Sequence, residues 1–431
     1  MATQTDALQI GDVTELELRL SKLARQFPQA GAVTVAFTDV RHECRAFTTP
    51  SRDGDEMGLP AGCMAKLFTS ALLSRLVLLR KINPDDSVVA LLPIHEREVR
   101  AQLVGVTVAH LLNHAHGLDD SALGAAPLLS NGSIDCNALC SEMVSAPSLF
   151  APGALYNYGH GGGYLAGAIV EQLYAMPFAS VLQSELLEPH GLRLVIEEQA
   201  GADAVALVCP STGGDWYVTE LQLLKLLAQQ LAAPESPTPS PAADHLSIMR
   251  ACSQRLPGWS PTEKSINLGW KGYGWDWYGH DGRSASSSLL ARINAKGKFA
   301  LVISCVGFSG IDPSYVLLSR LFRDWFPEIG RIDAPRSIDP AAAQDMDLGA
   351  FTGTYRTRAS TVVVGRTDRE LFVRLGDQGG RPHRLIAAAD NLFLTAPAVR
   401  DAFPFMQFIR PAADGRHEYL WNGQNVWRRC A

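Results

Sequence analysis

Residues 61–70 read Ala-Gly-Cys-Met-Ala-Lys-Leu-Phe-Thr-Ser and run directly into an apolar stretch that continues to about Arg80. This stretch predicts a helix. Residues three apart share one face of a helix, so Cys63 and Lys66 can meet at its start. A nearby ammonium group and a helix N-terminus both lower the pKa of a thiol, and the thiolate is the reactive form. The spacing indicates a cysteine nucleophile, although a small buried Cys63 and a solvated Lys66 fit the same residues.

Three more segments with chemical character follow in order along the chain. Residues 106–120 read Val-Thr-Val-Ala-His-Leu-Leu-Asn-His-Ala-His-Gly-Leu-Asp-Asp. Residues 152–167 read Pro-Gly-Ala-Leu-Tyr-Asn-Tyr-Gly-His-Gly-Gly-Gly-Tyr-Leu-Ala-Gly. Residues 268–288 contain Leu-Gly-Trp, then Tyr-Gly-His-Asp-Gly at 278–282, and a serine-rich run. Four ordered segments are far more specific than a single short motif.

Together these segments resemble the penicillin-binding-protein and serine β-lactamase superfamily, over roughly residues 15–328. Cys63-x-x-Lys66 stands where the superfamily has Ser-x-x-Lys, Tyr158 stands at its catalytic tyrosine, and His280-x-Gly282 replaces Lys-Thr-Gly. The segment at residues 106–120 is similar to the superfamily's "T-I-R-H-L-L-T-H-T-S-G-L" stretch. The resemblance implies an α/β (α+β) domain in which helices flank an antiparallel sheet and form a subdomain beside it.

The resemblance also implies a role for each site residue. Cys63 would attack a carbonyl, Lys66 would take its proton, and Tyr158 would assist or protonate the leaving group. The backbone N–H groups of Cys63 and of Arg283, the residue after Gly282, would form the oxyanion hole. Such donors contribute about 3 kcal/mol each to transition-state stabilisation in comparable sites. His280 belongs to the same strand motif.

The chain departs from the superfamily pattern at three positions. The nucleophile is Cys63, His160 replaces the asparagine of Tyr-x-Asn, and Arg283 replaces a small residue that lines the acyl pocket. His160 would either share the base role with Lys66 through a Cys–His pair or only hydrogen-bond the substrate amide. Arg283 would either bind a carboxylate or phosphate of the substrate, or point away and offer only its N–H group.

The composition is that of a globular enzyme. The 431 residues are 47% hydrophobic and 19% charged, with a formal net charge of −6. This charge excludes a basic nucleic-acid footprint, and no apolar run predicts a membrane span. Residues 1–12 lack the pattern of a signal peptide, so we expect a cytoplasmic protein with reduced thiols. The eight cysteines are scattered, and Cys136 and Cys140 lack a second ligand pair, so neither a metal nor another cofactor is expected.

Sequence patterns divide the first 328 residues into recognisable elements. Residues 13–28 predict an amphipathic helix, and residues 31–37 and 43–48 predict a strand hairpin. Residues 61–195 are expected to be mostly helical. A Pro/Ser-rich loop is expected at 234–241. Two further strands, at 286–294 and 299–306, would complete the sheet.

Beyond a linker at 329–347, residues 348–431 predict a second, smaller domain. Short alternating segments with turn residues between them are typical of an antiparallel barrel or sandwich. The predicted strand segments are 351–358, 361–364, 371–375, 384–387, 392–394, 406–410 and 418–421. The pattern resembles the lipocalin-like C-terminal modules of some superfamily members.

The cysteine favours acyl transfer over other chemistry, because a thioester reacts with amines more readily than an oxygen ester does. We expect an acyltransferase or condensing enzyme of small-molecule biosynthesis. Its partners would be an acyl donor, such as a carrier-protein or coenzyme A thioester, and a nucleophilic acceptor. The alternatives are an esterase or amide hydrolase of the same fold, and an inactive binding module whose nucleophile has drifted. A cysteine engineered into a serine enzyme would also fit the sequence.

Overall fold

The structure is a computed structural model that describes most of the chain. It comprises residues 18, 22, 32–38, 44–49, 58–196, 211–212, 216–231, 241–274, 276–284, 287–296, 299–307, 346–376, 381–396 and 405–430. The helix expected at 13–28, the loop at 234–241 and the linker at 329–347 lie almost wholly outside these residues.

An eight-stranded antiparallel sheet forms the centre of the first region, in the order β2-β1-β11-β10-β9-β8-β7-β6. Its strands are β1 (Ala32–Thr38), β2 (Cys44–Thr49), β6 (Ser253–Arg255), β7 (Ser265–Asn267), β8 (Trp270–Gly274), β9 (Trp277–Arg283), β10 (Ser287–Asn294) and β11 (Phe299–Val306). The predicted hairpin is confirmed by the pairing of β1 with β2, and the two later strands by the pairing of β10 with β11. The first and last strands of this region, β1 and β11, pair with each other near one edge of the sheet, next to the edge strand β2.

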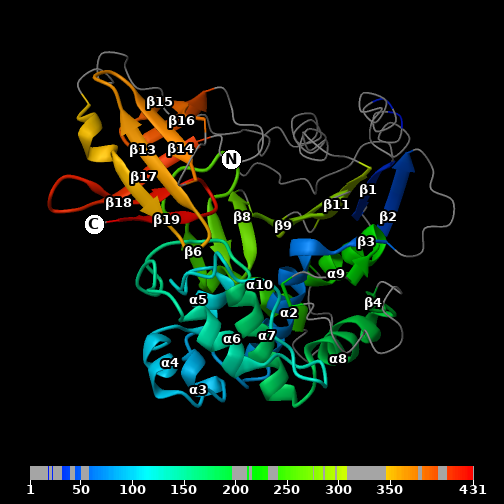
Figure 1. The fold of residues 1–431 in the computed structure, drawn as a ribbon. Coiled ribbons are helices and arrows are strands. Elements are labelled where there is room, and N and C mark those ends of the chain that lie inside the picture. Colours follow the sequence, from blue (N-terminus) through cyan, green and yellow to red (C-terminus); the bar gives the residue numbers. More distant parts are fainter. Residues whose placement is uncertain are drawn as a thin grey trace, which may run out of the picture.

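Helices pack against this sheet and extend below it (Figure 1). The helix α9 (Glu220–Leu231) contacts β1, β10 and β11, and α10 (Pro241–Ala251) contacts both α9 and α2 (Ala65–Leu78). The remaining helices are α3 (Val88–Leu91), α4 (Arg97–Gln102), α5 (Val108–Leu112), α6 (Cys136–Met143), α7 (Gly161–Tyr174), α8 (Phe178–Val181), the π-helix η2 (Leu182–Leu187) and the 3₁₀ turn η3 (Glu188–His190). This confirms the predicted helical character of residues 61–195.

The helix α2 is an apolar core element rather than an amphipathic surface helix. Eleven of its fourteen residues are buried. A helix buried on nearly all sides packs against several neighbours at once. Its contacts are with α7, α10, η2 and β8. The start of α2 is therefore held rigidly between the sheet and the helical layer.

A small three-stranded sheet lies beside the start of α2. Its strands run in the order β3 (Leu59–Pro60), β5 (Trp216–Val218), β4 (Val195–Ile196).

Among the described residues, no single helix is long and apolar enough to cross a membrane. The segments Gly161–Tyr174 and Phe178–Leu187 reach that length and composition only together, across a 73° bend.

The C-terminal region is a closed antiparallel barrel, because its first strand pairs with its last. Its strands are β12 (Gly353–Arg356), β13 (Thr361–Arg366), β14 (Leu371–Leu375), β15 (His383–Ala389), β16 (Leu392–Ala396), β17 (Phe405–Pro411), β18 (His417–Trp421) and β19 (Val426–Arg429). The sequence prediction omitted β19. It was also wrong to begin a strand at Phe351, because residues 348–351 form the 3₁₀ turn η6.

Two hydrophobic clusters show how the barrel is built and attached. The interior is filled by large side chains, including Phe351, Tyr355, Phe393 and Phe408. A second cluster joins the outside of the barrel to the first region and contains Leu149, Phe150, Leu155, Tyr156, Ile266, Ala388, Leu392, Phe405, Ile409, Tyr419, Trp421 and Val426. Strands β17 to β19 are thus buried on both faces. Figure 1 shows the barrel, in yellow to red, beside β6 and above α5.

Candidate active site

Cys63 lies in a tight turn at the entrance to α2. It belongs to the 3₁₀ turn η1 (Gly62–Met64), which continues directly into the helix. Cys63 is half-buried, while the next three residues are buried. Its sulfur therefore combines partial access from solvent with a helix N-terminus, where the macrodipole favours negative charge.

The end of β9 lies against this turn and is kept there by glycines. Gly62 has a φ of +49°, and a Cβ added to it would lie 3.0 Å from the Arg283 carbonyl oxygen and 3.4 Å from the Arg283 nitrogen. A Cβ on Gly282 would lie 2.9 Å from the Ala61 oxygen. The turn that carries Cys63 and the end of β9 that carries Arg283 are consequently in close backbone contact, as a two-donor oxyanion hole requires. The Arg283 residue itself is exposed.

Lys66 follows Cys63 by one helical turn and is buried, with 2% of its surface exposed. Its Nζ donates to the Thr212 carbonyl oxygen at 3.0 Å. Nζ also lies 4.9 Å from the centroid of the Tyr158 ring. Burial lowers the pKa of Lys66, and this outweighs the opposing influence of the nearby Cys63. A lysine whose neutral form is favoured can act as a general base.

Tyr158 is the other group close to Cys63. Its hydroxyl has no hydrogen-bond partner of ordinary geometry among the described residues. Burial raises the pKa of Tyr158 well above its usual value, and the charge of the neighbouring Cys63 raises it further. The hydroxyl therefore keeps its proton, which suits a proton donor or relay rather than a base.

The segment around Tyr158 is held by residues of the 106–120 motif. The His114 Nδ1 accepts from the Gly159 N–H at 3.4 Å, and its ring centroid lies 4.6 Å from that of Tyr158. Asp120 Oδ2 accepts from the Gly161 N–H at 2.8 Å, at the start of α7. A Cβ on Gly159 would lie 2.1 Å from Asp120 Oδ2, so the glycine permits this close approach.

His160 lies at the rim of the site and turns toward Thr212. It is exposed and precedes α7 as its N-cap residue. Its Nδ1 lies 3.2 Å from Thr212 Oγ1. The local packing around the ring, and then the charge of Lys66, lower the pKa of His160. The hydrogen bond of His160 thus goes to Thr212, whose carbonyl group holds Lys66. Sequence reasoning did not identify Thr212, because no motif marks it.

His280 is buried in β9 behind Tyr158. The two ring centroids are 6.0 Å apart. Nδ1 of His280 lies 2.8 Å from the backbone oxygen and 2.9 Å from the backbone nitrogen of Asp281. Burial, and after it the charges of Lys271 and Lys66, lower the pKa of His280 to about 3. His280 is therefore a neutral imidazole, not the cation of a Lys-Thr-Gly motif.

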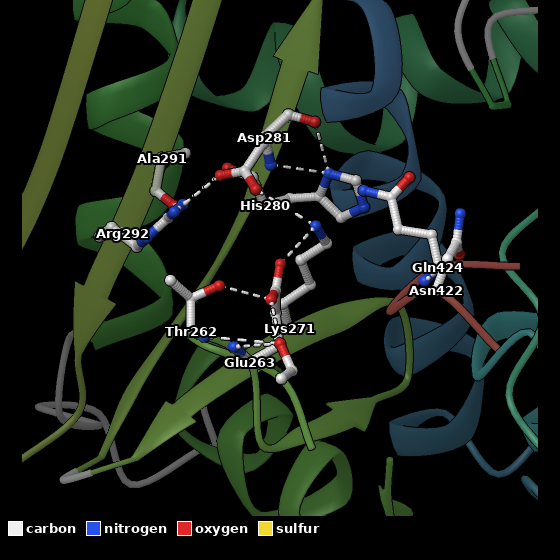
Figure 2. Close-up of polar contacts among 10 residues, drawn as sticks. Thr262, Glu263, Lys271, His280, Asp281, Ala291, Arg292, Asn422 and Gln424 are labelled. Atoms are coloured by element: carbon white, nitrogen blue, oxygen red, sulfur yellow. Dashed lines mark hydrogen bonds and ion pairs between the residues drawn. The ribbon is translucent and has the colours of Figure 1, made fainter. Parts of the chain in front are cut away.

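A buried charge cluster supports β9 from below (Figure 2), and sequence reasoning missed it. Lys271 Nζ lies 3.0 Å from Glu263 Oε1 and 3.2 Å from Asp281 Oδ2. Arg292 Nη2 lies 2.7 Å from Asp281 Oδ1, and its Nη1 donates to the His280 oxygen at 2.9 Å. Although burial alone would raise it, Lys271 lowers the pKa of Glu263 to about 2. Two cations and two anions balance here, which is the condition for burying charge.

The predicted site residues therefore form one constellation. Cys63, Lys66, Tyr158, His280, Gly282 and the backbone of Arg283 converge at the junction of α2 and β9, with His160 at the rim. Among the residues described, no group of three histidine, cysteine, aspartate or glutamate side chains could hold a metal ion.

Comparisons with known proteins identify the family and the fold. The beta-lactamase family model matches residues 59–311, which is more than half of the chain. No curated protein sequence matches at a significant level. A crystal structure of SurE with D-Leu shares 23% identity and a TM-score of 0.77, covering 97% of this chain and 99% of that one. Its likeness therefore includes the barrel.

Two other solved structures are more distant. The octameric penicillin-binding protein homologue from Pyrococcus abyssi has 16% identity and a TM-score of 0.55, covering 93% of this chain and 97% of that one. The D-amino acid amidase from Ochrobactrum anthropi SV3 has 16% identity and a TM-score of 0.54, covering 72% of this chain and 99% of that one. At these identities the three likenesses show a common fold. Together with the family match, they establish that the chain belongs to the beta-lactamase family.

Proposed function

We propose that this protein is an acyltransferase that works through an acyl-thioester on Cys63. The observation that carries the proposal is the pairing of a half-buried thiol with a buried lysine whose pKa is lowered by desolvation. Lys66 has no carboxylate within ion-pair distance among the described residues. No ion pair therefore holds Lys66 in its charged form, and its neutral amine can accept the proton of Cys63.

The reaction would proceed in two balanced steps. Cys63 Sγ attacks the carbonyl carbon of an acyl donor while its proton moves to Lys66 Nζ. The bond to the leaving group breaks, and the leaving group takes that proton, with the Tyr158 hydroxyl as relay. An acceptor amine then attacks the thioester, gives a proton to Lys66, and releases Cys63, which recovers a proton. The N–H groups of Cys63 and Arg283 would bind the oxyanion in both steps.

The donor is proposed to be a thioester whose acyl group ends in a D-amino acid residue. A thiol nucleophile exchanges readily with thioesters, so a carrier-protein or coenzyme A thioester suits Cys63. The D-configuration is supported by the names of two structural neighbours, SurE with D-Leu and the D-amino acid amidase. We place this reaction in the cytoplasm, because a reducing compartment keeps a nucleophilic thiol such as that of Cys63 in its reduced form.

Hydrolysis is the second candidate, because one neighbour is named as an amidase. In that case water, not an amine, would discharge Cys63. Product analysis separates the two reactions. Amide products that increase with added amine support transfer, whereas free acid at every amine concentration supports hydrolysis.

Intact-protein mass spectrometry tests the covalent step. The protein is exposed to N-acetylcysteamine thioesters of acetate and of N-acetyl-D-leucine, their L-leucine counterpart, and a β-lactam. We expect a mass gain that Cys63→Ala abolishes. The matched control is Cys430→Ala, which removes another half-buried thiol and should keep the adduct. An adduct that survives in Cys63→Ala, or none with any probe, would overturn the proposal.

A further inference from the structure

The barrel reaches the candidate active site through one hairpin turn. Residues 422–425 join β18 to β19, and they contact the segment that carries Tyr158. The Tyr158 N–H donates to the Gln424 carbonyl oxygen at 2.8 Å, and Asn425 Nδ2 donates to the Tyr158 carbonyl oxygen at 3.0 Å. The next residue, Val426, donates its N–H to Asn157 Oδ1 at 2.9 Å. Both backbone polar groups of Tyr158 are thus held by the barrel.

The turn is itself rigidly built, so it can hold Tyr158 in place. Asn422 Oδ1 accepts from the backbone N–H groups of Gln424 at 3.0 Å and Asn425 at 2.7 Å. Gly423 has a φ of +99°, which a side chain rarely tolerates. The flanking residues Trp421 and Val426 are buried in the cluster that contains Tyr156. The turn is therefore fixed on both sides by packing, and internally by hydrogen bonds.

One side chain of the turn faces the site. Figure 2 shows Gln424 pointing toward the imidazole ring of His280. Gln424 is exposed, whereas His280 is buried. The Gln424 side chain therefore joins an exposed position to the buried His280, and its amide group is available to a bound acyl donor. An amide side chain offers both a donor and an acceptor, which complements a peptide group.

We propose that the hairpin turn Asn422–Asn425 is a working part of the active site. Asn425 is a positioning residue for Tyr158, and Gln424 binds a peptide group of the acyl donor. This inference rests on the proposed function for its substrate. Because Tyr158 transmits a proton, a displacement of its ring slows acylation even though Cys63 and Lys66 stay in place.

A double-mutant cycle tests the role of Asn425. Asn425→Ala is expected to lower the acylation rate of Cys63 by about 10- to 100-fold. In a Tyr158→Phe background, Asn425→Ala should lower the acylation rate little further, since the hydroxyl that Asn425 helps to position is already absent. Asn425→Asp, which keeps the side-chain shape but loses the donor, is the second variant. Equal losses of acylation rate in both backgrounds would mean that Asn425 has a merely structural role, and would overturn its role in positioning Tyr158.

Hydrogen exchange gives a readout that needs no substrate. The Tyr158 amide should exchange faster in Asn425→Ala than in the wild type, because its bond to Gln424 loosens. The matched control is Asp414→Ala, which removes a similar side-chain bond, Asp414 Oδ1 to the Arg416 N–H at 3.0 Å, from the neighbouring hairpin turn. Unchanged exchange at Tyr158 would overturn the positioning role. Faster exchange without acylation by any probe would instead count against the proposed function alone.

Substrate comparison tests the role of Gln424. Gln424→Ala should lower kcat/KM for the N-acetyl-D-leucine thioester by about 10-fold, the effect of one hydrogen bond. The acyl group of the acetyl thioester has no peptide group, and the amide of the cysteamine arm is common to both probes, so kcat/KM for the acetyl thioester should not change. An equal loss with both thioesters, or no loss with either, would overturn the binding role. Asp414→Ala should leave both values unchanged.

Discussion

The molecule buries two lysines close together and surrounds them differently. Lys66 contacts a backbone oxygen, an aromatic ring and Cys63, and burial lowers its pKa. Lys271 contacts two carboxylates, those of Glu263 and Asp281 (Figure 2). A buried amine without a counter-ion is easily deprotonated, whereas one with two counter-ions is locked in its charged form. The groups that surround each buried amine therefore decide whether it suits proton transfer or a structural role.

Replacing Lys66 gives the largest expected effect on activity. Lys66→Met should reduce the rate of Cys63 acylation by about 10³- to 10⁴-fold, because the general base is lost. The free energy of unfolding should not fall, since an amine that burial penalises is replaced by an apolar chain of similar length. Thioester-dependent mass gain over time and urea denaturation measure the two quantities. A loss of stability as large as that of Lys271→Met would show that Lys66 has the same structural role as Lys271.

Replacing Lys271 should have the opposite outcome. Lys271→Met leaves Glu263 and Asp281 buried with one fewer cation, so we expect the free energy of unfolding to fall by about 3–5 kcal/mol. Urea denaturation measures it. The exposed Lys81 provides the control, because Lys81→Met should change stability by less than about 0.5 kcal/mol. A near-neutral Lys271→Met would show that the cluster does not stabilise the sheet.

These two lysines also mark where sequence reasoning succeeds and where it stops. The spacing of Cys63 and Lys66 is local, so a helix brings them together whatever the rest of the chain does. The strand-like runs at 286–294 and 299–306 likewise predicted β10 and β11 from local sequence alone. The partners of Lys271 come from β9 and from the chain before β7, and only the strand order brings them together.

The hairpin turn at 422–425 is the clearest feature that could not be predicted from the sequence. It lies more than 260 residues from Tyr158 in the sequence, and its Asn-Gly-Gln-Asn stretch indicates a turn and nothing more. Only the closure of the barrel and its packing against the Leu155–Tyr158 segment bring the two together. Thr212 was missed for the same reason, since its carbonyl acts through the backbone and carries no side-chain signal.

His280 lies near both lysines, and the pH dependence of stability reports on the charges around it. Burial, Lys271 and Lys66 lower the pKa of His280 to about 3, whereas burial alone lowers that of His245 to about 4. Since each native pKa lies below the ordinary 6.5, the unfolded chain binds the proton first as pH falls. Stability is therefore lost with decreasing pH, from about pH 6.5 down to each native pKa.

Substituting either histidine should remove its contribution to the fall in unfolding free energy at low pH. His280→Gln should make the fall in unfolding free energy shallower by up to about 1.4 kcal/mol per pH unit between pH 6.5 and 3. His245→Gln should do the same only down to about pH 4, because no lysine adds to the effect of burial there. Urea denaturation at half-unit pH steps measures both slopes. If the two windows end at the same pH, the lysine charges do not reach His280, and the electrostatic contrast between His280 and His245 is lost.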